Sequence, residues 1–557
     1  MPWIYVKRFD IEATQFKMDK GQNLYQGLAE NALLDAPCGG AGCCGKCRVR
    51  ILNADMLWQE REQDFFSAEE LRAGWRLACL HFAETDITLE LPPEEPASDI
   101  ISSGYLRDFH IEPVISKSLD SAGNTLVWAG RELVGRETGD STDRLWGLAI
   151  DIGTTTIVAS LVDMLSAREL ASVSCFNGQK AFGQDVMSRI HYAMTNKNGI
   201  LILQKVLLKD LNHLIREAIS RCNSNFPVTG KDIYDITVAG NTTMIHLLAG
   251  IDPSSMGKSP YLPAFNGALT LNGDKELGLP VSSHCQVYCL PAVSAFVGGD
   301  ITAGILACGI HDDPGNILFI DIGTNGEMVL SQKGRLTSCS CAAGPALEGM
   351  NISCGVRATP DAIDDVQLKG TGTNTEVEYS VIGDLPAVGL CGSGLLALVA
   401  ELLRQGILHK SGRLLDHPLV EKAAGKKRFI IDRERGLFLT QQDIRQVQLA
   451  KGAILSGIQT MVQANSLSLG EIDQVMIAGQ FGAHLKAESL TGTGILPREL
   501  KNRIKYVGNT SKSGAYLCLL SGRERETAPK IAQDITYIEL TRMPDFESSF
   551  ARAMQFD

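Results

Sequence analysis

The chain has 557 residues, which is enough for several domains. Its composition, 44% hydrophobic and 21% charged, is that of a globular protein and excludes disorder over most of its length. The net charge of −12 argues against a dedicated nucleic-acid-binding protein, which usually carries a basic surface. No apolar run approaches the roughly 18–20 residues of a membrane-spanning helix, and the N-terminus lacks the apolar stretch of a signal peptide. We therefore expect a cytoplasmic protein with no membrane segment and no nucleic-acid partner.

The first predicted domain spans residues 1–92. Hydrophobic alternation and helical spacing predict strand, turn and strand over 3–16, a helix over 23–33, and further strands over 47–55 and 87–92. Residues 91–99 are rich in Pro and acidic side chains, which is typical of a linker. We expect residues 93–145 to be a linker and a small intermediate segment with a few short strands.

The second predicted domain spans residues 146–557. Val/Ile-rich runs alternate there with Ala/Leu-rich helical runs, which predicts an α/β fold. Near the end, residues 535–540 have the pattern of a strand, and a short helical segment follows. The fold class of the whole chain is therefore predicted as α/β.

Cysteines are clustered near the N-terminus, and a cytosolic protein with clustered cysteines is more often a metal-binding or catalytic protein than a disulfide-linked one. Cys38, Cys44, Cys47 and Cys79 are separated by five, two and 31 residues. Glycines between them permit a loop that wraps closely around a metal centre. This set predicts the four ligands of a [2Fe–2S] cluster, with Cys43 as a bystander. A structural zinc site is the alternative, because four cysteines also suit zinc.

The spacing resembles that of the [2Fe–2S] ferredoxins, and of the adrenodoxin type in particular. The resemblance implies that residues 1–92 form a ferredoxin-like (β-grasp, α+β) domain, in which a small mixed sheet wraps around a helix.

Two similar motifs in the second domain each interrupt a hydrophobic strand with an acidic Gly/Thr turn. Gly and hydroxyl residues in such a turn point backbone N–H and side-chain O–H groups at an anion, and the aspartate can hold Mg²⁺. Two copies at domain-scale separation predict nucleotide binding, with Mg²⁺ held by the aspartates. Asp151 and Asp321 are the predicted catalytic carboxylates. The predicted phosphate contacts are Gly153, Thr154, Thr155 and Thr156 in the first copy and Gly323, Thr324, Asn325 and Gly326 in the second.

These motifs resemble the two phosphate loops of the ASKHA superfamily, in which two related α/β lobes clamp ATP between them. The adenosine loop of that fold resembles the stretch that contains Gly479, Gln480, Phe481 and Gly482. The superfamily usually has two adjacent glycines there, and Gln480 replaces the second. By the same analogy, a capped helix that begins near Asp443 borders the nucleotide. Its Lys451 is a candidate contact, with an ordinary surface lysine as the alternative.

A few other residues near these motifs have two interpretations each. Thr242 and Thr243 follow an apolar strand, where they are candidates for capping the next helix or for facing the nucleotide. His246 is expected to be structural rather than a metal ligand. Glu348 is a candidate for orienting water or for capping.

A ferredoxin domain fused to an ASKHA domain resembles the reductive activators of corrinoid-dependent methyltransferase systems. Strings such as VAGNTTMIHLLAG (238–250), FVGGDITAGILA (296–307) and AAGPALEGMNISCGVRA (342–358) carry the resemblance, which covers nearly the whole chain. It implies an ATP-hydrolysing corrinoid-protein reductase. The cluster would pass an electron to a Co(II) corrinoid and regenerate Co(I).

The resemblance implies a corrinoid protein as partner, a low-potential electron donor and a homodimer. A small-molecule kinase of the ASKHA type and a metalloprotein-assembly ATPase, each with a regulatory iron–sulfur domain, are the alternatives. The sequence identifies neither the corrinoid system nor the electron donor, and it names no catalytic base for ATP hydrolysis.

Overall fold

The fold is described from a computed structural model of the chain. The structure describes residues 1–8, 11–31, 33–34, 45, 47–53, 56–92, 104–224, 226–370, 372–383, 385–423, 425–479 and 485–556. Contacts divide the chain into two compact units, each described by itself. The first comprises Met1–Ser98 and Gly178–Tyr192, and the second comprises Asp99–Asn177 and Ala193–Asp557. None of the helices in the described ranges combines the length and apolar character needed to cross a membrane.

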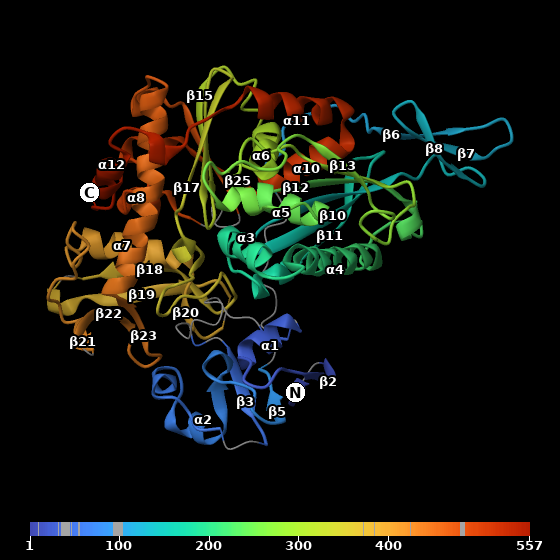
Figure 1. Cartoon of the computed structure of the whole chain (residues 1–557). Helices are drawn as coiled ribbons and strands as arrows, with labels where there is room; N and C mark the ends of the chain where they lie inside the picture. Colours follow the sequence, from blue (N-terminus) through green and yellow to red (C-terminus); the bar gives the residue numbers. More distant parts are fainter. Residues whose placement is uncertain are drawn as a thin grey trace. The chain divides into compact units, whose positions relative to one another are not determined.

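The first unit is built on a five-stranded sheet of order β2-β1-β5-β3-β4, drawn in blue in Figure 1. Helix α1 packs on it through buried Leu24, Tyr25 and Leu28, and the Asn23 side chain caps the helix by accepting from two backbone N–H groups. The bounds are β1 Trp3–Arg8, β2 Ile11–Lys17, α1 Leu24–Glu30, β3 Arg48–Ile51, α2 Ala68–Arg72, β4 Trp75–Leu77 and β5 Ile87–Glu90. The predicted strands and helix are therefore present.

The intermediate segment forms a small antiparallel sheet of three strands, β6 (Ile115–Leu119), β7 (Thr125–Ala129) and β8 (Glu132–Glu137). It belongs to the second unit. Buried Ile115 and Val127 join the core of that unit, and the Tyr234 hydroxyl donates to Glu137 at 2.8 Å.

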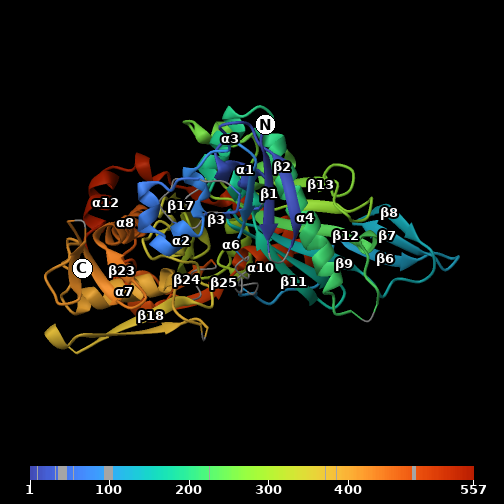
Figure 2. The ribbon, with the colours of Figure 1, turned by 90° about the horizontal axis from the view of Figure 1, so that it is seen from below.

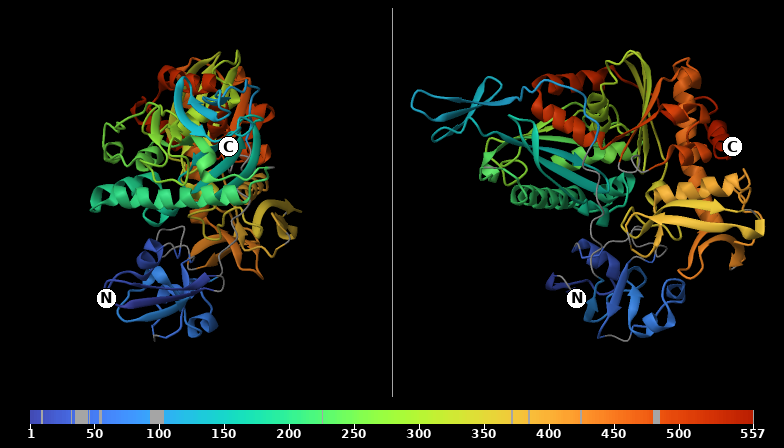
Figure 3. Two further views of the ribbon diagram at one scale, coloured as in Figure 1. Left: turned by 90° about the vertical axis from the view of Figure 1, so that its right-hand side faces the viewer. Right: turned by 180° about the vertical axis from the view of Figure 1, so that it is seen from behind.

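The rest of the second unit has two lobes, each with a six-stranded sheet. The first sheet has the order β11-β10-β9-β12-β14-β13 and the second β25-β24-β15-β16-β17-β26. In the first lobe the bounds are β9 Trp146–Ile152, β10 Thr156–Asp163, β11 Arg168–Phe176, α4 Gly199–Ser220, β12 Ile233–Gly240, α5 Thr242–Ala249, β13 Leu269–Asn272, β14 Gln286–Cys289 and α6 Gly299–Cys308. Helix α3 (Val186–Thr195), which lies in sequence between β11 and α4, belongs mostly to the first unit. Helix α4 covers one face of this sheet (Figure 3).

The second lobe adds two small sheets beside its main one. Its bounds are β15 Asn316–Ile322, β16 Gly326–Gln332, β17 Arg335–Cys341, β18 Ala362–Lys369, β19 Glu376–Val381, β20 Gly389–Leu390, α7 Gly392–Arg404, β21 Val420–Ala423, β22 Lys426–Asp432, β23 Leu437–Thr440, α8 Gln441–Ala464, β24 Gln474–Ala478, α9 Ala487–Gly492, β25 Ile504–Gly508, α10 Thr510–Leu520, α11 Gly522–Asp534, β26 Thr536–Tyr537 and α12 Phe546–Ala553. Figure 2 shows β18 beside α7.

The two lobes repeat one topology. A β-hairpin (β9–β10 or β15–β16) continues into a third antiparallel strand, and two parallel strands follow on the other side of the first strand. Helices α6 and α10 occupy equivalent positions after β14 and β25 and pack against each other. Helix α10 also packs on β9 and β12 of the first lobe, although it follows a strand of the second. The repeat predicted from the two motifs is thus a repeat of whole lobes.

The segment that begins the second unit caps the C-terminal ends of these central helices. The Arg107 backbone N–H donates to the Ala307 carbonyl at 3.1 Å, and its guanidinium donates to the Leu306 carbonyl at 3.1 Å, both at the end of α6. The Glu112 N–H donates to the Leu520 carbonyl at the end of α10, at 2.8 Å. These bonds satisfy carbonyl groups that a helix end otherwise leaves unpaired.

Candidate functional site

The pairing of β3 with β4 brings two of the predicted cluster ligands together. Cys47 directly precedes β3 and Cys79 follows β4 by one residue. Their sulfur atoms lie 3.1 Å apart, and both side chains are buried. Two adjacent thiols held by a sheet fit two of the four Cys ligands of a [2Fe–2S] cluster. Cys38, Cys43 and Cys44 lie outside the described residues, so the full ligand set stays a prediction.

Phosphate loop 1 is the turn between β9 and β10, as predicted. The Gly153 N–H donates to the Thr156 carbonyl at 2.9 Å, which closes the turn. Two asparagines from elsewhere in the first lobe hold the loop: Asn177 donates to the Gly153 carbonyl at 2.9 Å, and Asn241 donates to the Thr154 hydroxyl at 2.9 Å. These hydrogen bonds fix the conformation of the loop.

Asp151, at the end of β9, is held by the N-terminus of α10. The Asn509 side chain donates to one carboxylate oxygen at 2.9 Å, and the Ser511 hydroxyl donates to the other at 2.7 Å. Asn509 also caps α10, as Asn241 caps α5. The cap of α5 is thus Asn241. Thr242 and Thr243 are the first two residues of the helix itself, and both are buried.

Phosphate loop 2 is the turn between β15 and β16. The Gly323 N–H donates to the Asn325 carbonyl at 3.0 Å, and the Thr324 hydroxyl donates to Glu348 at 2.7 Å. Glu348 therefore holds this loop rather than capping a helix. Asp321 ends β15, and in the part of the chain that the structure describes its carboxylate accepts no hydrogen bond.

An acidic cluster of four carboxylates lies beside the two loops, and these groups influence one another's pKa values: Asp151, Asp300, Asp321 and Glu327. Within the described residues, no three of these side chains are grouped closely enough to hold a metal ion between them. Each is partly exposed. Burial raises the pKa of Asp151, against the hydrogen bonds from Ser511 and Asn509. Burial and neighbouring charges raise the pKa values of Asp300 and Asp321 to about 7, and they raise the pKa of Glu327 well above its ordinary value. Like charges at close range favour the protonated forms unless a cation is present, and Mg²⁺ prefers oxygen ligands of this kind.

Gly479 begins the predicted adenosine loop and lies against phosphate loop 2. Its φ is +92°, and a Cβ there would come within 2.6 Å of the Asp321 carboxylate and 2.8 Å of the Ile322 carbonyl. Only glycine fits this position without strain. Gln480, Phe481 and Gly482 lie outside the described residues, so their contacts stay a prediction.

Lys451 is a buried lysine of α8 rather than a surface residue, and its ammonium group donates to the Ala553 carbonyl of α12 at 2.7 Å. Its predicted contact with the nucleotide stays untested. The capped helix predicted near Asp443 is confirmed, because α8 begins after Thr440 and the Asp443 carboxylate completes the capping box.

His246 is buried in α5, where one ring nitrogen lies 2.7 Å from the Thr242 carbonyl and the ring stacks on Phe265 at 4.4 Å between centroids. This environment agrees with the structural role expected for it.

Three groups at the site were not singled out by the sequence: Asp300, Asn509 and Ser511. Asn509 and Ser511 lie just after β25 at the start of α10, as Asn241 lies just after β12, whereas Asp300 lies in the first turn of α6, well separated from β14. The signal available in the sequence was the position of the GNTS string directly after an apolar strand, and Asp300 has no such signal. The packing of α6 and α10 decides which N-terminal helix residues lie near the phosphate loops, and this packing cannot be predicted from local sequence patterns.

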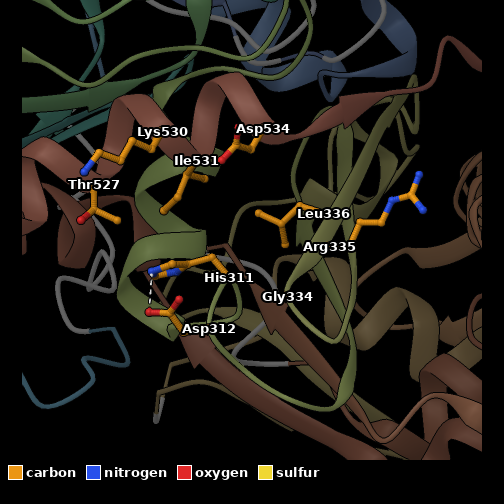
Figure 4. A pocket seen from close by; sticks show the side chains of 9 residues that line it. All are labelled: His311, Asp312, Gly334, Arg335, Leu336, Thr527, Lys530, Ile531 and Asp534. Carbon is orange, nitrogen blue, oxygen red and sulfur yellow. Dashed lines mark ion pairs between the residues drawn. The ribbon is translucent and has the colours of Figure 1, made fainter.

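A cavity of about 310 Å³ lies elsewhere in the second unit, lined by residues of α11, of the start of β17 with the turn before it, and of the segment that follows α6. Figure 4 shows His311 paired with Asp312, at 3.2 Å, and the Arg335 guanidinium turned away from them. The lining combines two carboxylates with two cations and includes no residue of the phosphate loops. We therefore assign it no ligand.

Comparison with protein families matches three consecutive parts of the chain. Residues 9–84 match the 2Fe-2S iron-sulfur cluster binding domain, residues 146–313 match the RACo middle region, and residues 315–557 match the C-terminal domain of RACo, its ASKHA domain. These matches confirm the predicted fold class.

Relatives resemble the chain over most of its length. The corrinoid activation enzyme RamQ of Eubacterium limosum is 28% identical over 94% of both chains. The [Co(II) methylated amine-specific corrinoid protein] reductase of Methanosarcina barkeri is 25% identical over 70% of this chain and 73% of its own. A solved structure titled as a reductive activator for corrinoid, iron-sulfur protein is 31% identical, covers 100% of this chain and 98% of its own, and has a TM-score of 0.71. The chain therefore belongs to the family of reductive activators of corrinoid proteins.

Proposed function

We propose that this protein is an ATP-dependent reductive activator of a corrinoid partner protein. The [2Fe–2S] cluster, bound in the ferredoxin domain, supplies one electron, which reduces the partner's cobalt from Co(II) to Co(I). The observation that carries the proposal is the combination in one chain of a buried Cys47–Cys79 pair with two phosphate loops that lie beside an acidic cluster.

The two lobes supply the ATPase. Asp151 and Asp321 hold Mg²⁺ directly or through water, and the loop residues 153–156 and 323–326 bind the phosphates through N–H and O–H groups. Asp300 lies near both carboxylates without being one of the two proposed metal ligands, so we assign it the role of accepting a proton from the attacking water. The residues of the adenosine loop, Gly479, Gln480, Phe481 and Gly482, bind the adenosine.

The proposal also covers the roles of the domains, the electron donor and the oligomeric state. Residues 1–92 are the electron-carrying domain, residues 93–145 the connection and residues 146–557 the ATPase. A low-potential donor reduces the cluster, and two copies of the chain form a homodimer. The relatives named as a corrinoid activation enzyme and as a corrinoid protein reductase favour this function over a kinase or an assembly ATPase.

The decisive experiment measures the oxidation state of cobalt in a corrinoid partner protein. The reduced protein is mixed anaerobically with a corrinoid protein in the Co(II) state, and the visible spectrum is recorded with and without Mg²⁺·ATP. We expect Co(I) to form only with ATP, with release of ADP and phosphate and no phosphorylated small molecule. Full formation of Co(I) without nucleotide, or a phosphorylated product, would contradict the proposal.

The cluster ligands are tested separately. Cys44→Ala should abolish the visible and EPR signature of the reconstituted [2Fe–2S] cluster, and Cys43→Ala should retain it. The reverse result would show that Cys43 is a cluster ligand and that Cys44 is not.

A further inference from the structure

Arg357 belongs to the second lobe, between β17 and β18, and its side chain reaches the first lobe. Its guanidinium carbon lies 4.7 Å from the centre of the Phe176 ring. Phe176 ends β11 and lies opposite Thr156 in the register of β10 and β11. The next residue, Asn177, donates to the Gly153 carbonyl. Arg357 thus lies against the strand that ends beside phosphate loop 1.

Arg357 is also close to phosphate loop 2. Burial raises the pKa of Glu348, and both the hydrogen bond from Thr324 and the positive charge of Arg357 counteract that rise. Since Glu348 holds Thr324, the guanidinium lies near a residue of the second loop as well. One cation therefore lies within reach of both loops that are proposed to bind the phosphates.

Among the described residues, the Arg357 guanidinium has no carboxylate as a direct ion-pair partner. Within the ranges that the structure describes, it makes no hydrogen bond and has no carboxylate oxygen within 4.0 Å. It is partly exposed, so it is not confined to the protein interior. A guanidinium carries five N–H donors in a planar arrangement that matches phosphate oxygens, and stacking on an aromatic ring orients this plane without using the donors.

The proposed ATPase lobes already place acidic groups and Mg²⁺ at the site, but a transferring phosphoryl group also carries negative charge on its outer oxygens. In related phosphoryl-transfer reactions an arginine neutralises this charge and raises turnover by about 10³–10⁵-fold. The described parts of both loops contain no lysine or arginine, so a cation has to come from elsewhere in the chain.

We propose that Arg357 is a catalytic residue of ATP hydrolysis that binds the terminal phosphates between the two loops, with Phe176 as its positioning residue. This inference rests on the proposed ATPase function of the two lobes. In the step, a water oxygen bonds to the γ-phosphorus as the bond to the bridging oxygen of ADP breaks. A water proton passes to a carboxylate of the site and then to solvent, and ADP and phosphate leave. Arg357 neutralises charge on the phosphoryl oxygens throughout.

The test compares ATP hydrolysis by the full-length wild type, Arg357→Ala, Arg357→Lys and Phe176→Leu, without any corrinoid partner. Arg428→Lys is the matched control, because Arg428 stacks on Phe438 at 4.5 Å but pairs with Glu421, away from the phosphate loops. We expect Arg357→Ala to lower kcat about 10³-fold, with KM for ATP changed much less. Arg357→Lys should recover only part of the loss, Phe176→Leu should lower kcat about tenfold, and the control should match the wild type.

Two readouts separate catalysis from folding. Free guanidinium ion should restore part of the turnover of Arg357→Ala, and a fluorescent ATP analogue should still bind that variant. Turnover of Arg357→Ala within threefold of the wild type would overturn the inference, as would equal losses of binding and turnover. Should Arg357→Ala fail to fold, Arg357→Lys at the wild-type rate would have the same meaning.

The inference and the proposed function fail in different ways. If Arg357→Ala hydrolyses ATP normally while the wild type still generates Co(I), only the role of Arg357 is wrong. If Arg357→Ala loses hydrolysis but the wild type generates no Co(I) in any corrinoid protein, the ATPase assignment stands and the activator function is wrong.

Discussion

The two phosphate loops share a motif and a topology, yet their aspartates lie in different environments. Asp151 accepts two hydrogen bonds from the start of α10, whereas Asp321 accepts none from the described residues and lies among like charges. A hydrogen-bonded carboxylate is fixed in orientation and partly neutralised, whereas an isolated one among like charges is stabilised only by a proton or a cation. The repeat thus places one aspartate in a hydrogen-bonded environment and the other in an electrostatically unfavourable one, which a bound cation would relieve.

The largest expected effect concerns Asp321. Asp321→Asn should lower ATP turnover by about 10²–10³-fold, because it removes a charge that acts in the loaded site. The same change should leave the melting temperature of the ATP-free protein unchanged or raised, since it relieves repulsion from Asp300 and Asp151. Turnover and calorimetry on one preparation test both parts, and normal hydrolysis would show that Asp321 does not serve the metal.

Asp151 should behave differently in the ATP-free protein. Asp151→Ala leaves the Asn509 amide and the Ser511 hydroxyl without their acceptor, which costs about 1–3 kcal/mol of unfolding free energy. Denaturant unfolding without nucleotide measures this loss, with Asp321→Ala as the control. Equal stability of the two variants would contradict the distinction between the loops.

The pKa values of about 7 predict a pH dependence for the ATP-free and loaded states. Burial and neighbouring charges raise the pKa values of Asp300 and Asp321 above the unfolded value, so their contribution to the stability of the ATP-free protein falls as pH rises from about 4 to 7. Mg²⁺ binding requires the deprotonated forms. For each carboxylate engaged, affinity for Mg²⁺·ATP should rise about tenfold from pH 6 to pH 8. Calorimetric titration at both values tests this, and Asp300→Asn plus Asp321→Asn should flatten the profile.

The smallest effect is expected at the cap of α5. Asn241→Ala removes both the cap and the bond to Thr154, which costs about 1 kcal/mol of stability and loosens phosphate loop 1. Thr440→Ala removes the cap of α8 without touching a phosphate loop and is the control. Both variants should lose stability, but only Asn241→Ala should also raise KM for ATP.

Local patterns were sufficient to predict the loops but not what surrounds them. Asp151 and Asp321 end hydrophobic strands and are followed by tight turns, so a few consecutive residues define both hairpins. Asn509 lies 358 residues from Asp151 in the chain, and its contact exists only because α10 packs on the sheet of the other lobe. The same holds for Arg357 and Phe176, which come from different lobes.

The division of the chain into units was likewise only partly predictable from local sequence patterns. The ferredoxin sheet was predictable because alternation within short strands is a local signal, and the pairing of β3 with β4 explains why Cys47 and Cys79 meet. Residues Gly178–Tyr192 group with the first unit, although they lie in sequence between β11 and α4 of the second. Nothing in their composition sets them apart from their neighbours, since the grouping depends on contacts rather than on sequence pattern.

Helices α6 and α10 connect two distant parts of the second unit. Their N-terminal residues lie near Asp151 and Asp321, and their C-terminal carbonyls are bonded by Arg107 and Glu112, near the start of the second unit. A helix of ten residues is about 15 Å long and rigid over that length. A displacement of the helix start beside Asp151 would therefore be transmitted, within the second unit, to the carbonyl groups that Arg107 and Glu112 bind.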